Sequence, residues 1–149
     1  MPEKATLERA REDRREGKAP TTQAGEFVRE EIEEIRAGKH GARSTKQAIA
    51  IGLSKARRAG VKLAPPKPGK TSEATRHKAQ RDLEKADSGR KKPSAKRSQA
   101  TLKALQRESG AAASPEALSR QARTAASKRS AAKRSASTKK AARTRKGEK

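Results

Sequence analysis

The chain of 149 residues carries 40 Lys and Arg against 17 Asp and Glu, a formal net charge of +23 at pH 7. Its 14 Leu, Ile, Val and Phe residues fall far below the roughly 20% that a globular domain needs, which excludes a single large hydrophobic core. Cysteine is absent, which excludes disulfides and thiolate catalysis, and no apolar run approaches the roughly 18 residues of a membrane span. We therefore expect a mostly α cytoplasmic protein, with a small helical hairpin or three-helix head and a largely disordered, partly helical basic tail.

Charge is distributed unevenly along the chain. Residues 1–40 have a net charge of −1, residues 41–70 of +8 and residues 71–149 of +16. Pro65, Pro66 and Pro68 indicate a stiff, extended linker. The sequence thus predicts a helical head over residues 1–63, best patterned over 22–63. A proline-rich linker is expected over 64–71, and a low-complexity basic tail with transient helices over 72–149.

Two helices are predicted in the nearly neutral segment. Residues 4–16 alternate Glu with Arg, which is typical of an exposed helix stabilised by ion pairs, with Leu7 as its one large apolar side chain. The second helix should begin near Thr21 and Thr22 and end at Ala37, before Gly38. At the helical repeat, one of its faces is apolar and formed by Ala24, Val28, Ile32 and Ile35. The other face is acidic and outward, formed by Glu26, Glu30, Glu33 and Glu34.

The third predicted helix has the clearest start signal. Ser44 and Gln47 have the spacing of a capping box, and Gly60 follows the last periodic residue. Its apolar face is formed by Ile49, Leu53 and Ala56, and its ridge of small residues by Ala48, Gly52 and Ala56. A glycine in mid-helix costs about 1 kcal/mol relative to alanine. We therefore expect the second helix to approach closely at Gly52.

The outside of the third helix and the loop before it are basic. Residues 38–45 lead into a helix N-terminus, where free N–H groups favour an anion, so this loop is either a phosphate site or an ordinary capped connection. The candidate nucleic-acid contacts in the head are Lys39, Arg43, Ser44, Thr45, Lys46, Lys55, Arg57, Arg58 and Lys62. Ile51 lies among them, as a stray exposed side chain or as a partner contact. A homodimer would use Val28, Ile32, Ile35 and Ile51.

Other motifs carry no function. The segment 64–71 resembles a nucleotide-binding loop in its Gly69-Lys70-Thr71 end, but three of its residues are prolines without the N–H groups that such a loop needs. His40 and His77 have no partner at metal-ligand spacing in the sequence, so we expect surface residues and no metal or cofactor. The glutamates of the second helix, on an exposed face, are expected to be solvated or ion-paired rather than catalytic.

The tail is a polycation with almost no large apolar side chain. From Ser114 onward, Leu118 is the single one, so a polyanion is the ligand expected to order this segment. Single-strand binders stack bases on several aromatic rings, whereas Phe27 is the one aromatic residue here, which favours duplex as the target. The candidate contacts in the tail are Lys128, Arg129, Lys133, Arg134, Lys139, Lys140, Arg143, Arg145 and Lys146.

Two resemblances follow from these segments. The stretch Thr22 to Leu63 reads TQAGEFVREEIEEIRAGKHGARSTKQAIAIGLSKARRAGVKL and resembles the core of a family of small, Lys- and Arg-rich bacterial proteins of unknown function. The tail is similar in composition to those of linker histones and bacterial histone-like proteins. It repeats KRSAA and KRSAS between Lys128 and Ser137 and lacks the S/T-P-K-K repeats of some linker histones. The first resemblance implies a bacterial origin, and the second implies coating or compaction of the chromosome.

The expected function is therefore non-sequence-specific binding of nucleic acid through the phosphate backbone, with DNA favoured over RNA, by a nucleoid-associated accessory protein that is not an enzyme. One alternative is a protein-interaction or dimerisation module that uses the acidic helix, with the tail as a solubilising or localising arm. Association with ribosomal RNA is a third possibility, which composition does not separate from DNA binding.

Overall fold

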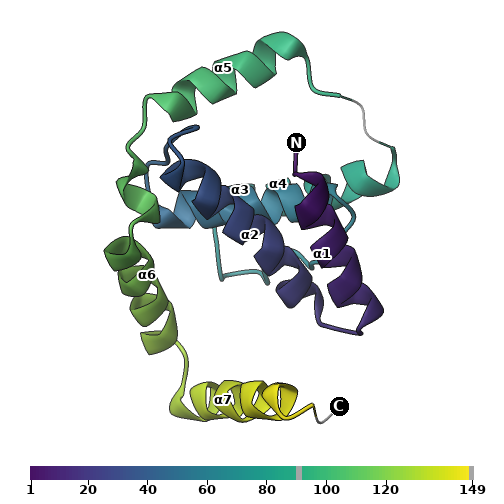
Figure 1. Cartoon of the computed structure of the whole chain (residues 1–149), viewed down its shortest axis with the longest axis vertical. Helices are drawn as coiled ribbons and strands as arrows, with labels where there is room; N and C mark the ends of the chain where they lie inside the picture. Colours follow the sequence, from purple (N-terminus) through teal and green to yellow (C-terminus); the bar gives the residue numbers. More distant parts are fainter. Residues whose placement is uncertain (90–91, 148–149) are drawn as a thin grey trace. The chain divides into compact units, whose positions relative to one another are not determined.

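The computed structural model describes residues 1–89 and 92–147. The mostly α prediction is confirmed, because helices account for the regular structure throughout this described part (Figure 1). The chain divides into two compact units, Met1–Ser114 and Pro115–Lys149. Of the predicted tail, residues 90–91 and 148–149 lie outside the described residues.

The first unit begins with three helices, α1 (Lys4–Arg15), α2 (Pro20–Arg36) and α3 (Thr45–Arg58). The helix α2 begins before the predicted threonine cap because Pro20 occupies its first turn, where a missing N–H costs nothing. The predicted glycine stops are confirmed, since Gly38 and Gly60 adopt φ values of 74° and 98° beyond the ends of α2 and α3. At α3, Ser44 Oγ accepts a hydrogen bond from Gln47 N at 3.2 Å, which confirms the predicted cap.

The core of this unit is small and centred on Phe27. This side chain is 1% exposed and packs with Ala10, Ala24, Ala56 and Val61. Leu7, Leu53, Ala59 and Leu63 pack against the cluster from its edge. The core thus joins α1, α2, α3 and the segment that follows α3, and it holds the α2–α3 pair in place.

The ridge of small residues on α3 lies against α2, as predicted. Ala48, Gly52 and Ala56 are all buried. A Cβ atom added at Gly52 would lie 2.7 Å from the Cα of Val28 and 3.0 Å from its Cγ2. Glycine therefore permits a backbone approach that any larger residue would prevent.

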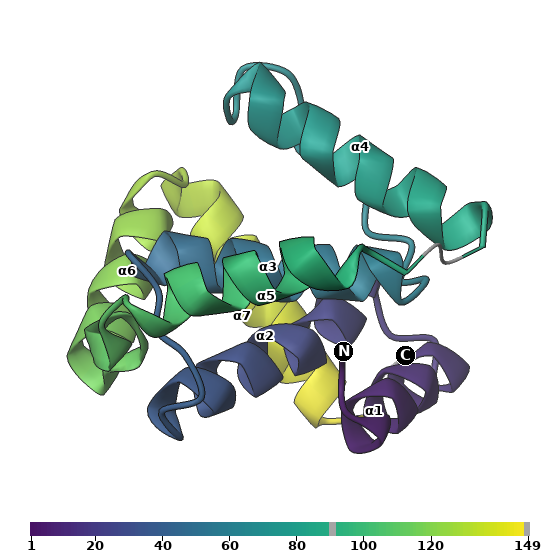
Figure 2. The same cartoon turned by 90° about the horizontal axis from the view of Figure 1, so that it is seen from above.

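The first unit extends well past the predicted head. The helix α4 (Glu73–Asp87) packs on α3, with Asp82 Oδ2 accepting a hydrogen bond from Ser54 Oγ at 2.6 Å. The helix α5 (Ala95–Gln106) leads into a short 3₁₀ helix, η1 (Gly110–Ala113), which contacts α2 and α3. In Figure 1, α5 stands away from α2 and α3 along most of its length, and its C-terminal end returns to them; Figure 2, seen from above, shows α5 passing over them.

The second unit contains α6 (Pro115–Ser127) and α7 (Ala131–Arg145). Ser130 Oγ caps α7 by accepting from Lys133 N at 3.3 Å, and hydroxyls such as Thr138 Oγ1 bond back to the carbonyl four residues earlier. The prediction of a largely disordered tail is therefore not supported. The missing apolar core and the repulsion between Lys and Arg side chains predict a chain that is only partly helical, whereas the serine caps and the many alanines favour helix without a core.

Candidate nucleic-acid interface and a buried carboxylate cluster

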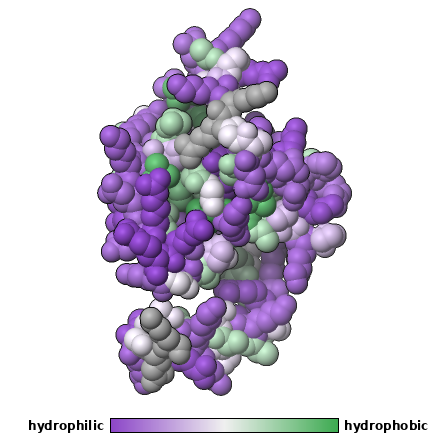
Figure 3. Space-filling view, turned by 90° about the vertical axis from the view of Figure 1, so that its right-hand side faces the viewer, coloured by the Kyte–Doolittle hydropathy of each residue, from purple (hydrophilic) through white to green (hydrophobic). Residues whose placement is uncertain are grey.

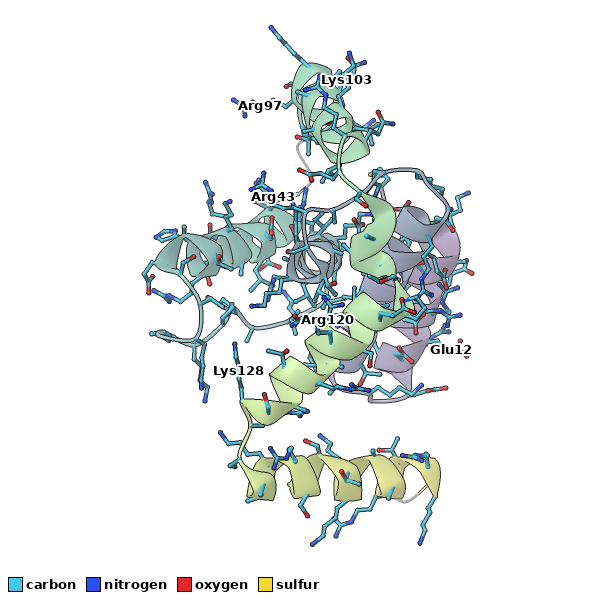
Figure 4. All side chains as sticks on the ribbon, turned by 90° about the vertical axis from the view of Figure 1, so that its left-hand side faces the viewer. Glu12, Arg43, Arg97, Lys103, Arg120 and Lys128 are labelled. Carbon is cyan, nitrogen blue, oxygen red and sulfur yellow. The ribbon has the colours of Figure 1, made fainter. Side chains whose placement is uncertain are left out.

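The predicted contacts of the head divide by exposure. Lys46 is exposed and forms no ion pair with a described residue. Arg43 has 82% of its side chain exposed, with Glu108 at 3.8 Å (Figure 4). Lys62 and Arg58 are exposed but paired with α4, through Asp87 at 2.8 Å and Asp82 at 3.3 Å. These cations belong to the surface, and a phosphate would compete with carboxylates for three of them.

Three predicted contacts are structural instead. Arg57 is 7% exposed and donates to the carbonyls of Leu63 and Ala64 at 3.1 and 3.3 Å, which ties the segment after α3 to the helix. Burial lowers the pKa of its guanidinium, and the negative charge of Asp82, which raises this pKa, offsets only part of the effect. Thr45 is also buried, and its hydroxyl donates to the Ala112 carbonyl at 2.7 Å.

Lys55 is the third. Its ammonium lies 2.7 Å from Glu31 Oε2 and 2.8 Å from Glu34 Oε2. We therefore correct the assignment of Thr45, Arg57 and Lys55 to a nucleic-acid interface. The sequence pattern placed them among exposed cations because it did not anticipate that η1 and buried carboxylates would take up their polar atoms.

The loop 38–45 is closed by the chain itself. Gly41 N donates to the Leu105 carbonyl at 2.9 Å, and Ala42 N donates to the Ser109 carbonyl at 3.1 Å. Arg43 N donates to Gln47 Oε1 at 2.7 Å, and the Ser44 hydroxyl is occupied by its cap. Because these donors are satisfied within the chain, the capped connection describes this loop better than the phosphate site.

The dimer surface proposed from sequence is largely internal. Ile32 and Ile35 are 7% and 2% exposed within the chain's own fold, and Val28 packs on Gly52. Ile51 is half-buried. The predicted dimer contact through the two buried isoleucines is therefore corrected, because η1 covers the end of α2 that carries Ile35.

The second unit presents its cations to solvent. Every residue from 127 to 147 is exposed, and no acidic residue occurs from 117 to 147. Lys128 extends from the end of α6 in Figure 4, where Arg97 and Lys103 likewise extend from α5 in the first unit. The tail contacts predicted from sequence are all exposed here, with no ion pair to a described residue: Lys128, Arg129, Lys133, Arg134, Lys139, Lys140, Arg143, Arg145 and Lys146.

Two carboxylates of α2 are buried inside the first unit, which the sequence did not predict. Glu30 is 3% exposed and Glu31 is fully buried, so the prediction that Glu30 belongs to an outward acidic face is wrong. Glu30 Oε1 accepts a hydrogen bond from the Glu3 backbone N at 2.6 Å, which ties the start of α1 to α2. Glu30 Oε2 and both oxygens of Glu31 accept no hydrogen bond from a described residue. The ammonium of Lys55 lies 2.7 Å from Glu31 Oε2 and forms an ion pair with it.

His40 faces the same carboxylates. Its side chain is 9% exposed, and its Nε2 lies 3.4 Å from Glu31 Oε1 and 3.7 Å from Glu34 Oε2. The expectation of a solvated His40 without partners is therefore wrong, while His77 is exposed on α4 as expected. The spacing of residues along the sequence did not indicate the cluster, because the turn at Gly38 brings His40 back over the last turns of α2.

Two groups of this cluster have shifted pKa values. Burial raises the pKa of Glu34, but the hydrogen bond from Lys55, with the charges of Lys55, Lys39 and His40, outweighs burial and brings the net pKa below 4.5. Burial lowers the pKa of Lys55, but Glu31 and Glu34 outweigh it and raise the net pKa above 10.5. Lys55 and Glu34 are thus held as an ion pair.

The helical repeat of α2 contained the signal for Glu31. At about 100° per residue, Glu31 lies between Phe27 and Ile35 on the face whose other members, such as Ala24, are buried. An acidic residue on an apolar face indicates a buried charge with a partner. Lys55, facing it from α3, is that partner.

Comparison with known proteins supports one part of the resemblance noted for the head, namely a family of unknown function. Residues 8–68, about two fifths of the chain, match the family described as "Family of unknown function (DUF6496)". Neither the curated proteins nor the solved structures gave a match. Among the described residues, no helix combines the length and the apolar character needed to cross a membrane. The chain is thus similar, over α2, α3 and most of α1, to an uncharacterised family.

Proposed function

We propose that this protein binds the phosphate backbone of duplex nucleic acid, preferentially DNA, without reading base sequence, as a nucleoid-associated accessory protein rather than an enzyme. The observation that carries the proposal is α7. It has six Lys and Arg, and Lys146 follows at its C-terminal cap. All seven are exposed, in a stretch without an acidic residue. Like charges placed together destabilise a free helix, so the segment gains most from a polyanion.

The spacing of the cations on α7 suits a duplex. At about 100° per residue, five of them fall within an arc of about 140° on one side of the helix. These five are Lys133, Lys139, Lys140, Arg143 and Lys146. A helix of this length spans about 22 Å, over which duplex DNA presents about 13 phosphates. Phosphates therefore outnumber the cations of one face, and each cation can find an anionic partner.

The character of the surface supports backbone contacts over base recognition. The face shown in Figure 3 is mostly hydrophilic, with small hydrophobic areas. Phe27 is buried in the core and is the one Phe, Tyr or Trp residue. No such ring is therefore exposed for base stacking, the usual device of single-strand binders. Contacts to phosphate alone position a protein without specifying a sequence.

The direct test removes the charge of one face of α7. A variant with the five cations of that face changed to Gln should bind a mixed-sequence 30-base-pair DNA duplex more weakly. The slope of log K against log salt should become shallower by about four, since each lost phosphate contact removes about 0.9 from the slope. Fluorescence anisotropy with a labelled duplex, repeated with RNA duplex and single-stranded DNA, measures this.

A matched control removes the same charge elsewhere. Changing five exposed cations of α1 and α2 to Gln lowers the net charge equally, but these residues alternate with carboxylates; they are Lys4, Arg11, Arg14, Arg15 and Arg29. We expect a slope change of less than half that of the α7 variant. Equal losses would show that total charge, not α7, determines binding, and tighter binding to RNA duplex would move the target to RNA.

A further inference from the structure

A second site lies in the first unit, apart from the cations of α7. Glu31 and Glu34 on α2 and His40 in the loop after it each place one ligand atom within 4.8 Å of the others. His40 Nε2 lies 3.4 Å from Glu31 Oε1 and 3.7 Å from Glu34 Oε2. We propose that Glu31, Glu34 and His40 bind one divalent transition-metal ion of the Zn²⁺ class.

The shorter of these two separations fits a shared ion better than a hydrogen bond. In a tetrahedral site with bonds of 2.0–2.1 Å, neighbouring ligand atoms lie about 3.4 Å apart. A charge-assisted N–H···O bond is shorter, at about 2.7–2.9 Å. Nε2 of His40 and Oε1 of Glu31 have the spacing of two ligands around a shared cation.

Independent support comes from the buried oxygen of Glu31. Glu31 is fully buried, and its Oε1 accepts no hydrogen bond from a described residue. Lys55 approaches the other oxygen, Oε2, so it leaves Oε1 facing His40. A buried carboxylate oxygen without a partner is costly, and a metal ion between Oε1 and Nε2 would satisfy it.

The tautomer of His40 is set by its other ring nitrogen. Nδ1 lies 3.0 Å from the Gly41 carbonyl, which only accepts hydrogen bonds, so Nδ1 carries the proton. Once Nε2 has given up its proton, as binding of a metal requires, this tautomer directs the Nε2 lone pair toward Glu31 and Glu34. Metal-binding histidines in general donate their second N–H to a carbonyl or carboxylate in this way.

The charges near the site leave room for a cation. Glu30, Glu31 and Glu34 are buried or nearly so. Among the described residues, Lys55 is the one lysine or arginine of matching burial paired with Glu31 and Glu34. Lys39 reaches Glu34 at 3.7 Å from a half-exposed position. A divalent ion held by Oε1 of Glu31 would add the missing charge while Lys55 stays on Oε2. One imidazole and two carboxylates are ligands that suit Zn²⁺, and also Mn²⁺ or Fe²⁺.

Titration of the full chain with Zn²⁺ alone tests the proposal. Isothermal titration calorimetry should give one site per chain. At a free Zn²⁺ concentration about 100-fold above Kd, the Tm should rise by about 10 °C. The net charge of +23 repels cations from the surface, which keeps non-specific binding low. No saturable binding below 1 mM Zn²⁺ would overturn the proposal.

The chain has two histidines, which supply a matched pair of variants. We expect His40→Ala to weaken Zn²⁺ binding by at least about 100-fold and His77→Ala to leave it unchanged. Glu31→Gln, which keeps the shape of the side chain, should behave like His40→Ala. Retention of the site in His40→Ala, or its loss in His77→Ala, would overturn the assignment.

A measurement on the unchanged chain guards against variants that fail to fold. In the ¹⁵N spectrum of the histidine side chains, Zn²⁺ should shift the Nε2 resonance of His40 and leave that of His77 in place. If His40 instead responds to pH and not to Zn²⁺, the cluster binds a proton only, and the proposal is wrong.

Discussion

Gly52 of α3 lies directly against the backbone of Val28 in α2, so that a Cβ on Gly52 would stand 2.7 Å from the Val28 Cα. This approach brings Lys55 of α3 within reach of Glu31 and Glu34 of α2. The packing of the two helices and the buried charge cluster are therefore one arrangement, because a wider spacing would separate the ammonium from its carboxylates.

Substitution of Gly52 should be destabilising. We expect Gly52→Ala to lower the free energy of unfolding by about 1–3 kcal/mol, because the added methyl group meets backbone that has no space to yield. Gly25→Ala is the matched control. Gly25 is also within a helix but has nothing within 4 Å of an added Cβ, so alanine should stabilise α2 by about 0.5–1 kcal/mol. Urea denaturation followed by circular dichroism measures both, and equal effects would contradict the close approach.

Removal of the Lys55 ammonium should be costly. We expect Lys55→Met to lower the free energy of unfolding by about 3–5 kcal/mol, because it leaves the buried Glu31 without its cation. Lys62→Met breaks the exposed pair with Asp87, at the similar distance of 2.8 Å. Its cost should stay within about 1 kcal/mol. Chemical denaturation of the two variants compares them, and a cost below 1 kcal/mol for Lys55→Met would refute the buried pair.

Stability should decline in mild acid. The net pKa of Glu34 lies below 4.5 in the folded chain, so unfolding takes up a proton between the folded and the unfolded pKa values. The contribution of Glu34 is complete above the unfolded pKa and is lost as the pH falls through the lower, folded value. Urea denaturation between pH 3 and pH 7, with EDTA present, should show a steeper decline for the native chain than for Glu34→Gln. Parallel curves would mean that the Lys55–Glu34 pair contributes nothing.

The end of α5 should depend on Gly41. A Cβ at Gly41 would overlap the carbonyl oxygen of Glu108, so we expect Gly41→Ala to detach the segment from Leu105 to Ala113. Hydrogen exchange at the amide of Ala42, which donates to the Ser109 carbonyl, should then accelerate by at least about tenfold, since one lost contact of about 1.4 kcal/mol gives that factor. Gly110→Ala, whose Cβ would meet Ile35 at an ordinary 3.6 Å, is the control. Unchanged exchange in Gly41→Ala would show that this segment is not bound to the loop.

Much of the helical head could be predicted from local signals. The Ser44 cap, the glycine stops at Gly38 and Gly60 and the close approach at Gly52 each follow from the chemistry of one or two residues, and the structure confirms them. The start of α2 lies before the threonines because Pro20 fits the first turn, where its missing N–H needs no partner.

The contacts between distant segments could not be predicted in the same way. The carbonyl of Ala112, which accepts a hydrogen bond from Thr45, is 67 residues from it in the sequence. A backbone acceptor of this kind cannot be predicted from a pattern of side chains. The burial of Glu31 could have been predicted, since the helical repeat places it on the buried face of α2. The role of its partner Lys55 could not, because in the sequence Lys55 resembles the exposed cations around it. Charge composition alone does not separate a lysine that binds phosphate from one that neutralises a buried carboxylate.

Binding of a mixed-sequence DNA duplex by the full chain between 50 and 200 mM salt tests the central claim most directly. If about eight phosphates are neutralised, log K should fall with log salt with a slope of about −7, a loss of about 10⁴-fold over this range. The same slope should hold for duplexes of different sequence. A slope shallower than about −2, or affinity that depends strongly on sequence, would contradict the account of a protein that binds the phosphate backbone through its exposed cations.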